Sequence, residues 1–198
     1  MSKNLYRDFR TIAEIEKQLL FIDTVPDMDR YIEEYTIRSK KACDKLSGEL
    51  NISYGPTVDE YVDIFPAAKK NAPIMIFIHG GAWQMLSARD FSFVALGLAA
   101  NNITSVIVNY SLCPKVSIDE ITRQARASIA WTYRNARSFG GDPEQLYVSG
   151  HSAGAHLTVM CANTEWKEEY NLPDDIIRAG IPISGVFDLT PCRYTAFQ

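Results

Sequence analysis

Several features that define other classes of protein are missing from this sequence. No apolar stretch reaches the roughly 20 residues that a membrane-spanning helix needs, and the charged start of the chain lacks the apolar segment of a secretory signal. No long block of like charge, internal repeat or low-complexity tract occurs. The formal net charge of −4 argues against nucleic acid or an anionic membrane as the main partner. We therefore expect the partner to be a small-molecule substrate.

Cysteine and histidine are also scarce. The four cysteines form no C-x-x-C pair, and none of the three histidines lies at metal-ligand spacing from them. This pattern favours reduced thiols in a cytoplasmic protein over disulfides or zinc. The sequence thus predicts a cytoplasmic location and no metal site.

The composition is that of an ordinary globular protein, and the apolar pattern predicts an α/β fold. With 198 residues, 46% of them hydrophobic, we expect a single domain over residues 1–198. Strands alternating with helices predict a mainly parallel sheet flanked by helices. The expected strands are 51–55, 58–65, 74–78, 105–110, 146–149 and 181–184, the first two forming a hairpin at Gly55-Pro56. The expected helices are 5–21, 28–46, 90–100, a helix opened by Ser117 and ended by Gly140, and 153–162.

The segment Gly150-His151-Ser152-Ala153-Gly154 has the form G-x-S-x-G between an expected strand and an expected helix. This pattern is typical of a sharp strand-to-helix turn that lifts one serine hydroxyl out of the sheet. The turn also places the Ala153 N–H beside the position where negative charge develops during acyl transfer. We interpret Ser152 as a nucleophile rather than an ordinary turn serine.

A second motif, His79-Gly80-Gly81-Ala82-Trp83, follows the 74–78 strand at its carboxyl end, where parallel sheets bind ligands. Consecutive glycines let backbone N–H groups face a substrate. The alternative interpretation is a plain Gly-Gly turn after a strand, with no role in binding. Trp83 either forms the base of the substrate pocket or only packs against the loop as a structural residue. His79 is expected to brace this loop, and His156 to be buried or structural, so neither is the predicted general base.

Taken together, these segments resemble the α/β-hydrolase fold, and more narrowly its kynurenine formamidase (arylformamidase) branch. The likeness rests on the 74–78 strand, residues 79–84 and residues 150–156, with similar segments at 90–92 and 184–189. That branch shows H-G-G-x-W where lipases and esterases show H-G-G-G. The likeness spans about residues 50 to 190.

The resemblance implies a serine hydrolase that cleaves N-formyl-L-kynurenine to L-kynurenine and formate. Ser152 would attack the formyl carbonyl, while backbone N–H groups of Gly80, Gly81, Ala82 and Ala153 would form the oxyanion hole. A histidine oriented by an aspartate would move the proton. Trp83 would contact the substrate, and no metal or organic cofactor would be needed.

One departure from the family pattern concerns the catalytic triad. In this fold the acid and then the histidine follow the serine, yet His156 is the only histidine after Ser152. We expect the triad Asp and His beyond Gln198, the C-terminal strands to be missing and the domain to be incomplete at its C-terminus. The chain alone is then predicted to be nearly inactive, with an unpaired sheet edge that favours a homo-oligomer.

Two alternative functions remain open at this point. The first is a general carboxylesterase or lipase-like hydrolase of the same fold. The second is an inactive fragment with a binding role, which the missing late histidine favours for this chain in isolation.

Overall fold

The computed structural model describes residues 4–19 and 25–195 and contains a six-stranded sheet in the order β1-β2-β4-β3-β5-β6. Strand β2 pairs antiparallel with both β1 and β4, whereas β4, β3, β5 and β6 run parallel to one another. The strands are β1 (Glu49–Ser53), β2 (Tyr61–Phe65), β3 (Ala72–Ile78), β4 (Thr104–Val108), β5 (Gly141–His151) and β6 (Ala179–Ile183). The helices are α1 (Ile12–Leu19), α2 (Met28–Lys45), α3 (Val94–Ala100), α4 (Ile118–Asn135), α5 (Ala153–Ala162) and α6 (Trp166–Tyr170).

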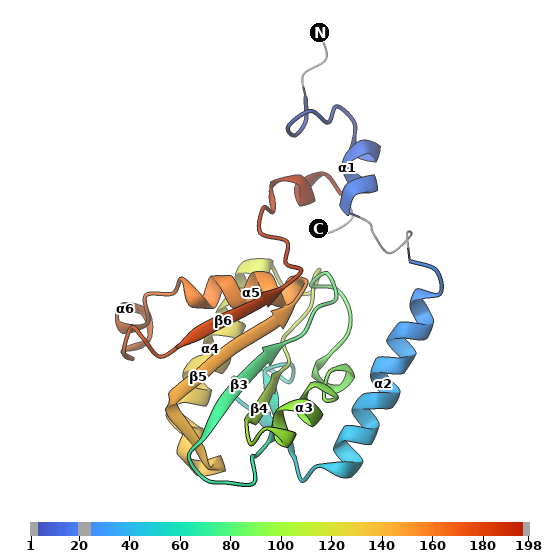
Figure 1. The fold of residues 1–198 in the computed structure, drawn as a ribbon. Helices are drawn as coiled ribbons and strands as arrows, with labels where there is room; N and C mark the ends of the chain where they lie inside the picture. The colour runs from blue at the N-terminus through green and yellow to red at the C-terminus, as the bar shows by residue number, and fades with distance from the viewer. Residues whose placement is uncertain (1–3, 20–24, 196–198) are drawn as a thin grey trace.

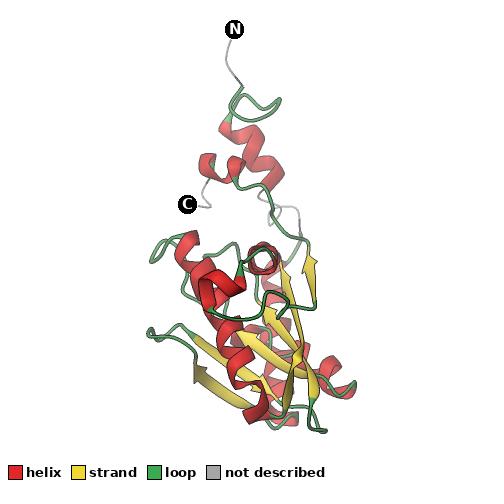
Figure 2. Ribbon diagram, turned by 90° about the vertical axis from the view of Figure 1, so that its left-hand side faces the viewer, coloured by secondary structure: helices red, strands yellow, loops and turns green. Residues whose placement is uncertain are grey.

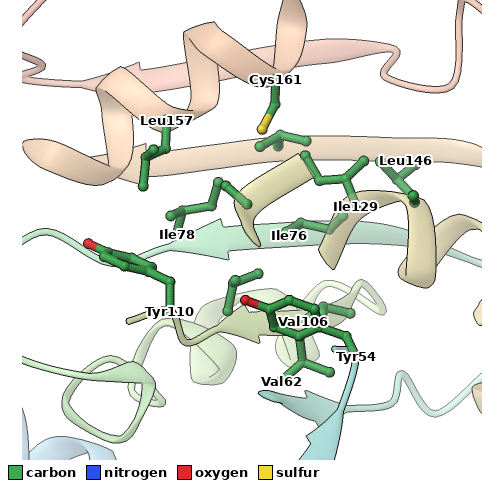
Figure 3. Packing of buried hydrophobic residues seen from close by; sticks show 14 of the residues in the cluster. Tyr54, Val62, Ile76, Ile78, Val106, Tyr110, Ile129, Leu146, Leu157 and Cys161 are labelled. Atoms are coloured by element: carbon green, nitrogen blue, oxygen red, sulfur yellow. The ribbon is translucent and has the colours of Figure 1, made fainter. Parts of the chain in front are cut away.

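Helices cover both faces of the sheet, with α2 and α3 on one face and α4 and α5 on the other (Figure 1). Alternate residues of each strand point to opposite faces, so β3 sends Ile76 into the α4/α5 face and Phe77 into the α2/α3 face. The larger core lies on the α4/α5 side, where Ile76, Ile78, Leu146 and Leu157 pack together (Figure 3). Burying each such side chain stabilises the fold by about 1.5–3 kcal/mol.

The chain reverses its winding direction between β3 and β5, which are adjacent in the sheet. From β3 it continues to β4 on one side, and from β5 it continues to β6 on the other side. The carboxyl ends of these two strands are the position where open α/β sheets bind ligands. Both sequence motifs lie at this point.

The amino-terminal segment packs against the segment that follows β6. In Figures 1 and 2, α1 lies beside the short 3-10 helix η4 (Thr190–Tyr194), beyond the carboxyl ends of the strands. Asp188 joins the two segments, because it accepts a hydrogen bond from the Tyr6 hydroxyl at 2.6 Å and lies 3.8 Å from the Arg7 guanidinium. These bonds and the Thr190 backbone hold the Asp188 pKa at about 2, so its carboxylate is charged at neutral pH.

The α/β class, the mainly parallel sheet and the amino-terminal hairpin are as predicted, and Ser117 caps α4 by accepting from the Glu120 N–H at 3.2 Å. Two predicted helices need correction. The expected 90–100 helix is split into a 3-10 turn, η2 (Ala88–Asp90), and α3, because Phe91 turns into the core of the α2/α3 face. The expected 5–21 helix begins only at Ile12, after a turn at Tyr6 to Phe9, and residues 20–21 lie outside the described residues.

The last strand lies at an edge of the sheet, a position that tolerates the proline within it. Pro182 lies in β6, which pairs only with β5 in the described part of the chain. No helix among the described residues is long and apolar enough to cross a bilayer.

Candidate active site

Ser152 lies at the turn between β5 and α5 with φ 55° and ψ −116°. A positive φ is unusual for a residue other than glycine, and such strain is held only where neighbouring structure enforces it. Here the Ser152 N–H donates to the Ile183 carbonyl at 2.9 Å, while its own carbonyl accepts from the Ala155 N–H at 2.9 Å. The serine is partly exposed, whereas Ala153 is fully buried.

The two glycines of the G-x-S-x-G motif are required by contact distances. A Cβ at Gly150 would lie 2.2 Å from the Gly154 carbonyl oxygen, and a Cβ at Gly154 would lie 2.0 Å from the Ile78 carbonyl oxygen. Both distances are far below a van der Waals contact. The tight turn therefore depends on glycine at both positions, and it presses the start of α5 against the end of β3.

The His-Gly-Gly loop lies directly against this turn. Ile78, the last residue of β3, pairs with Gly150 of β5, so the two chains leave the sheet side by side. A Cβ at Gly80 would lie 2.7 Å from the His151 carbonyl oxygen and 3.2 Å from Ser152 Cβ. The structure therefore brings the two sequence motifs together, with the backbone of Gly80 touching the serine turn.

The loop itself has an unusual backbone. Gly81, Ala82 and Trp83 have consecutive positive φ values of 114°, 51° and 58°. The Gly81 carbonyl accepts from the Gln84 and Met85 N–H groups at 2.9 and 3.0 Å, which closes the turn. A Cβ at Gly81 would lie 2.0 Å from the Met85 carbonyl oxygen, so glycine is required there. Because these three residues have positive φ, their backbone N–H groups do not continue the alternating directions that N–H groups have along a β-strand.

His79 supports this loop from the buried side. The buried His79 ring stacks on Tyr110 at 4.1 Å between ring centroids, and its Nδ1 donates to the Gly80 carbonyl at 2.7 Å. Burial lowers the His79 pKa to about 4, so the ring is neutral at physiological pH. The Tyr110 hydroxyl donates to the His79 carbonyl at 2.8 Å. The sequence analysis did not identify Tyr110 as a support of this loop. Its position just after β4, which is adjacent to β3, was a signal that could have indicated it.

Trp83 is in the core, with 1% of its surface exposed. Its ring meets the His156 ring edge-on at 5.4 Å, which joins the loop to α5 one turn after Ser152. The Trp83 Nε1 and the His156 Nδ1 are buried and without hydrogen-bond partners in the described part of the chain. This position favours the packing role over the alternative of a substrate-binding surface.

A general base for Ser152 is not found among the described residues. None of the three histidines forms a hydrogen bond with Ser152 in residues 4–19 and 25–195. His79 bonds Gly80, His156 packs on Trp83, and His151 has its Nδ1 beside Gly80. No group of three or more His, Cys, Asp or Glu side chains in those ranges is arranged to hold a metal ion. The triad acid and histidine beyond Gln198 stay a prediction.

The strand order, the flanking helices and the strained serine turn define an α/β-hydrolase fold. A solved structure, that of a thioesterase candidate from Silicibacter sp. TM1040, has the same fold with a TM-score of 0.75 at 28% identity, covering 87% of this chain and 63% of that one. The chain belongs to the BD-FAE family, whose model matches residues 62–191.

Two curated relatives are named for different activities. A kynurenine formamidase from Salmo salar is 32% identical over 166 residues, which cover 83% of this chain and 53% of the relative. Esterase LipQ from Mycobacterium tuberculosis is 30% identical over 150 residues, which cover 71% of this chain and 36% of the relative. The chain thus spans about half the length of the first relative and about a third of the second.

Proposed function

We propose that Ser152 is the nucleophile of a hydrolase that cleaves an aryl formamide, with N-formyl-L-kynurenine as the substrate. The observation that carries the proposal is the contact between the strained Ser152 turn and Gly80 of the loop after β3. This contact supports a role for backbone N–H groups of the loop beside the serine hydroxyl, at the carboxyl ends of β3 and β5. The likeness to the salmon kynurenine formamidase supports the choice of substrate.

The proposed reaction has two steps. The Ser152 oxygen attacks the formyl carbon, a base takes the hydroxyl proton, and the carbonyl oxygen becomes an anion held by N–H groups of Gly80, Gly81, Ala82 and Ala153. The C–N bond then breaks, and the aryl amine leaves with that proton. Water attacks the formyl-serine ester, releasing formate and regenerating the hydroxyl. No metal or organic cofactor enters either step.

A base supplied from solution tests the role of Ser152 in the chain as it exists. A general base contributes roughly 10²–10⁴-fold, so we expect slow hydrolysis of N-formyl-L-kynurenine that rises with added imidazole. Ser152→Ala should abolish the imidazole-dependent part, whereas Ser138→Ala, at an exposed serine in another part of the chain, should not. Equal imidazole-dependent rates in the native chain and in Ser152→Ala would contradict the proposal.

A carboxylesterase of the same fold is the second candidate, and the likeness to LipQ favours it. Under the same imidazole conditions, the Ser152-dependent rates on N-formyl-L-kynurenine and p-nitrophenyl acetate separate the two. A higher specificity constant for the formamide supports the first candidate, and a higher constant for the acetate ester supports the second. Robust ester hydrolysis without imidazole, lost in Ser152→Ala, would instead refute the prediction that the chain lacks its base.

A further inference from the structure

The imidazole of His151, the residue before the serine, borders the loop that follows β3. His151 is the last residue of β5 and is partly exposed. If Gly80 carried a Cβ, that atom would lie 3.1 Å from His151 Nδ1 and 3.2 Å from Ser152 Cβ. The imidazole and the serine side chain therefore lie beside the same small space next to the loop.

This imidazole differs from the other two in having no partner within residues 4–19 and 25–195. The His79 ring is buried, bonds the Gly80 carbonyl and stacks on Tyr110, and the His156 ring is buried against Trp83. The unpaired nitrogens of His151 are not among the buried polar atoms of those ranges, so both keep accessible surface. A bound molecule can therefore reach a ring nitrogen that the protein does not use.

The protonation state decides what this ring offers. Burial lowers the pKa of His151 below its ordinary value, so the imidazole is neutral at physiological pH. A neutral imidazole has one nitrogen that donates a hydrogen bond and one that accepts. His151 therefore brings an acceptor to the candidate active site.

Other acceptors at this position are already in use. The Gly80 carbonyl is paired with the His79 ring, and the Gly81 carbonyl accepts from two N–H groups of its own turn. The Ser152 carbonyl accepts from two N–H groups in the first turn of α5. The backbone around the serine thus supplies donors for a carbonyl oxygen, whereas the His151 ring supplies an acceptor that is not committed.

A hydrogen-bond acceptor distinguishes amides from esters. A secondary formamide carries an N–H on the atom that leaves, and an ester carries an oxygen without a proton at the same place. A site that bonds a substrate N–H selects against an analogue without it, because the acceptor of the site is then left unpaired. An acceptor beside the serine would therefore act on the leaving side of the scissile bond.

We propose that His151 is a specificity-determining residue whose acceptor nitrogen binds the N–H of a secondary aryl formamide and so favours formamides over aryl esters of the same acyl group. The assignment rests on the proposed function, because it takes Ser152 as the nucleophile. It does not make His151 the general base, since no hydrogen bond joins the imidazole to Ser152 in the described part of the chain.

Three substrates with the same formyl group test this contact: p-nitroformanilide, its N-methyl derivative, which lacks the N–H, and p-nitrophenyl formate. Rates are measured with added imidazole, and the rate of the matching Ser152→Ala variant is subtracted. His151→Leu should lower the specificity constant for p-nitroformanilide about fivefold or more and leave the other two unchanged. His151→Asn, whose side-chain oxygen can accept near the place of Nδ1, should keep most of the p-nitroformanilide rate.

A second measurement needs no turnover. In Ser152→Ala with nitrogen-labelled histidine, p-nitroformanilide should shift the imidazole nitrogen resonances of His151 in heteronuclear NMR, and the N-methyl derivative should not. The buried His79 and His156 rings serve as internal references. The His151 signals are assigned by their loss in His151→Asn.

Two kinetic results would overturn the assignment: an equal loss on all three substrates in His151→Leu, which a base or a structural residue would give, or no loss on p-nitroformanilide. Equal NMR shifts with both formamides, or none with either, would overturn it as well. Hydrolysis that does not depend on Ser152, with the selective NMR shift retained, would count against the proposed function alone. Hydrolysis that depends on Ser152, with an unselective His151→Leu, would count against the assignment alone.

Discussion

At the scale of single residues, the site depends on backbone conformations that most side chains disfavour. A residue held in a sparsely populated region of φ and ψ costs on the order of 1–3 kcal/mol, and Ser152, Ala82 and Trp83 all have positive φ. The Ser152 turn persists because Gly150 and Gly154 let α5 approach β3 closely. The fold therefore concentrates strain where the two motifs touch.

Two glycine-to-alanine substitutions distinguish a steric clash of the added Cβ from the general effect of alanine on helix stability. Gly154→Ala places a Cβ 2.0 Å from the Ile78 carbonyl oxygen, and we expect it to lower the free energy of unfolding by about 3 kcal/mol or more. Gly97→Ala, in α3 with no atom within 4 Å of the new Cβ, should raise it by about 0.5–1 kcal/mol. Urea unfolding measures both, and a neutral Gly154→Ala would show that the turn has room to relax.

The sequence predicted the residue-level site in part. The serine turn and the glycine loop were both recognised, because each needs glycine at fixed spacing and each follows an apolar strand. The place of Trp83 could not be decided, since a tryptophan after Gly-Gly fits a pocket or a core equally well. Burial of its ring against His156 comes from tertiary packing between the loop and α5, which local sequence does not encode.

At the scale of elements, an ion pair between a buried carboxylate and a partly exposed arginine links α4 to the sheet. Glu60, just before β2, is fully buried and accepts from the Arg123 guanidinium at 2.6 Å and from the Thr57 N–H at 3.0 Å. Arg123 also bonds Glu120 in the first turn of α4.

Removing one partner of this pair should be more harmful than removing both. Arg123→Met leaves the buried Glu60 carboxylate with only the Thr57 N–H as a partner, and we expect a loss of about 1–3 kcal/mol in the free energy of unfolding. The double variant Glu60→Gln with Arg123→Met should recover a substantial part of that loss. Glu34→Gln, which removes an exposed pair with Arg38, should cost less than about 1 kcal/mol. Additive losses in the double variant would argue against coupling between the two side chains.

Element boundaries show how far local sequence signals reach. The α4 start was predicted from Ser117 and Glu120, because N-capping is a local interaction. The structure contains the bond from the Glu120 N–H to the Ser117 hydroxyl, whereas the Glu120 carboxylate accepts from Arg123 and Gln124 instead of completing the capping box. The break between η2 and α3 was missed, since Phe91 and Ala95 look like one helical face in sequence. In the structure Phe91 packs near Phe77 of β3 and Tyr35 of α2, and these distant contacts determine the break.

At the scale of the whole molecule, the sheet ends in an exposed apolar strand. In β6, Ile181 and Ile183 have 50% and 46% of their surface exposed. An unprotected edge strand with apolar side chains offers its backbone groups to another chain. The α/β class followed from the alternating pattern of strands and helices, and an unpaired sheet edge was expected as well. Which side chains of that edge strand are exposed depends on tertiary packing, which the pattern does not specify.

A lysine at the edge should reduce association between copies of the chain. We expect the 198-residue chain to sediment as concentration-dependent oligomers, and Ile181→Lys to shift it toward monomer. Val58→Lys is the control, because Val58 is apolar and 87% exposed but lies in the turn between β1 and β2. A native chain that stays monomeric at every concentration would rule out association through β6.

The bond from Tyr6 to Asp188 has a further consequence. It ties the beginning of the chain to the backbone that runs from β6 to η4, and this backbone starts at Ile183, whose carbonyl accepts from the Ser152 N–H. A purification tag or a truncation at the amino end would loosen that link without touching any reacting atom. An insertion in the connection between β2 and β3, at the amino ends of the parallel strands, would leave it intact.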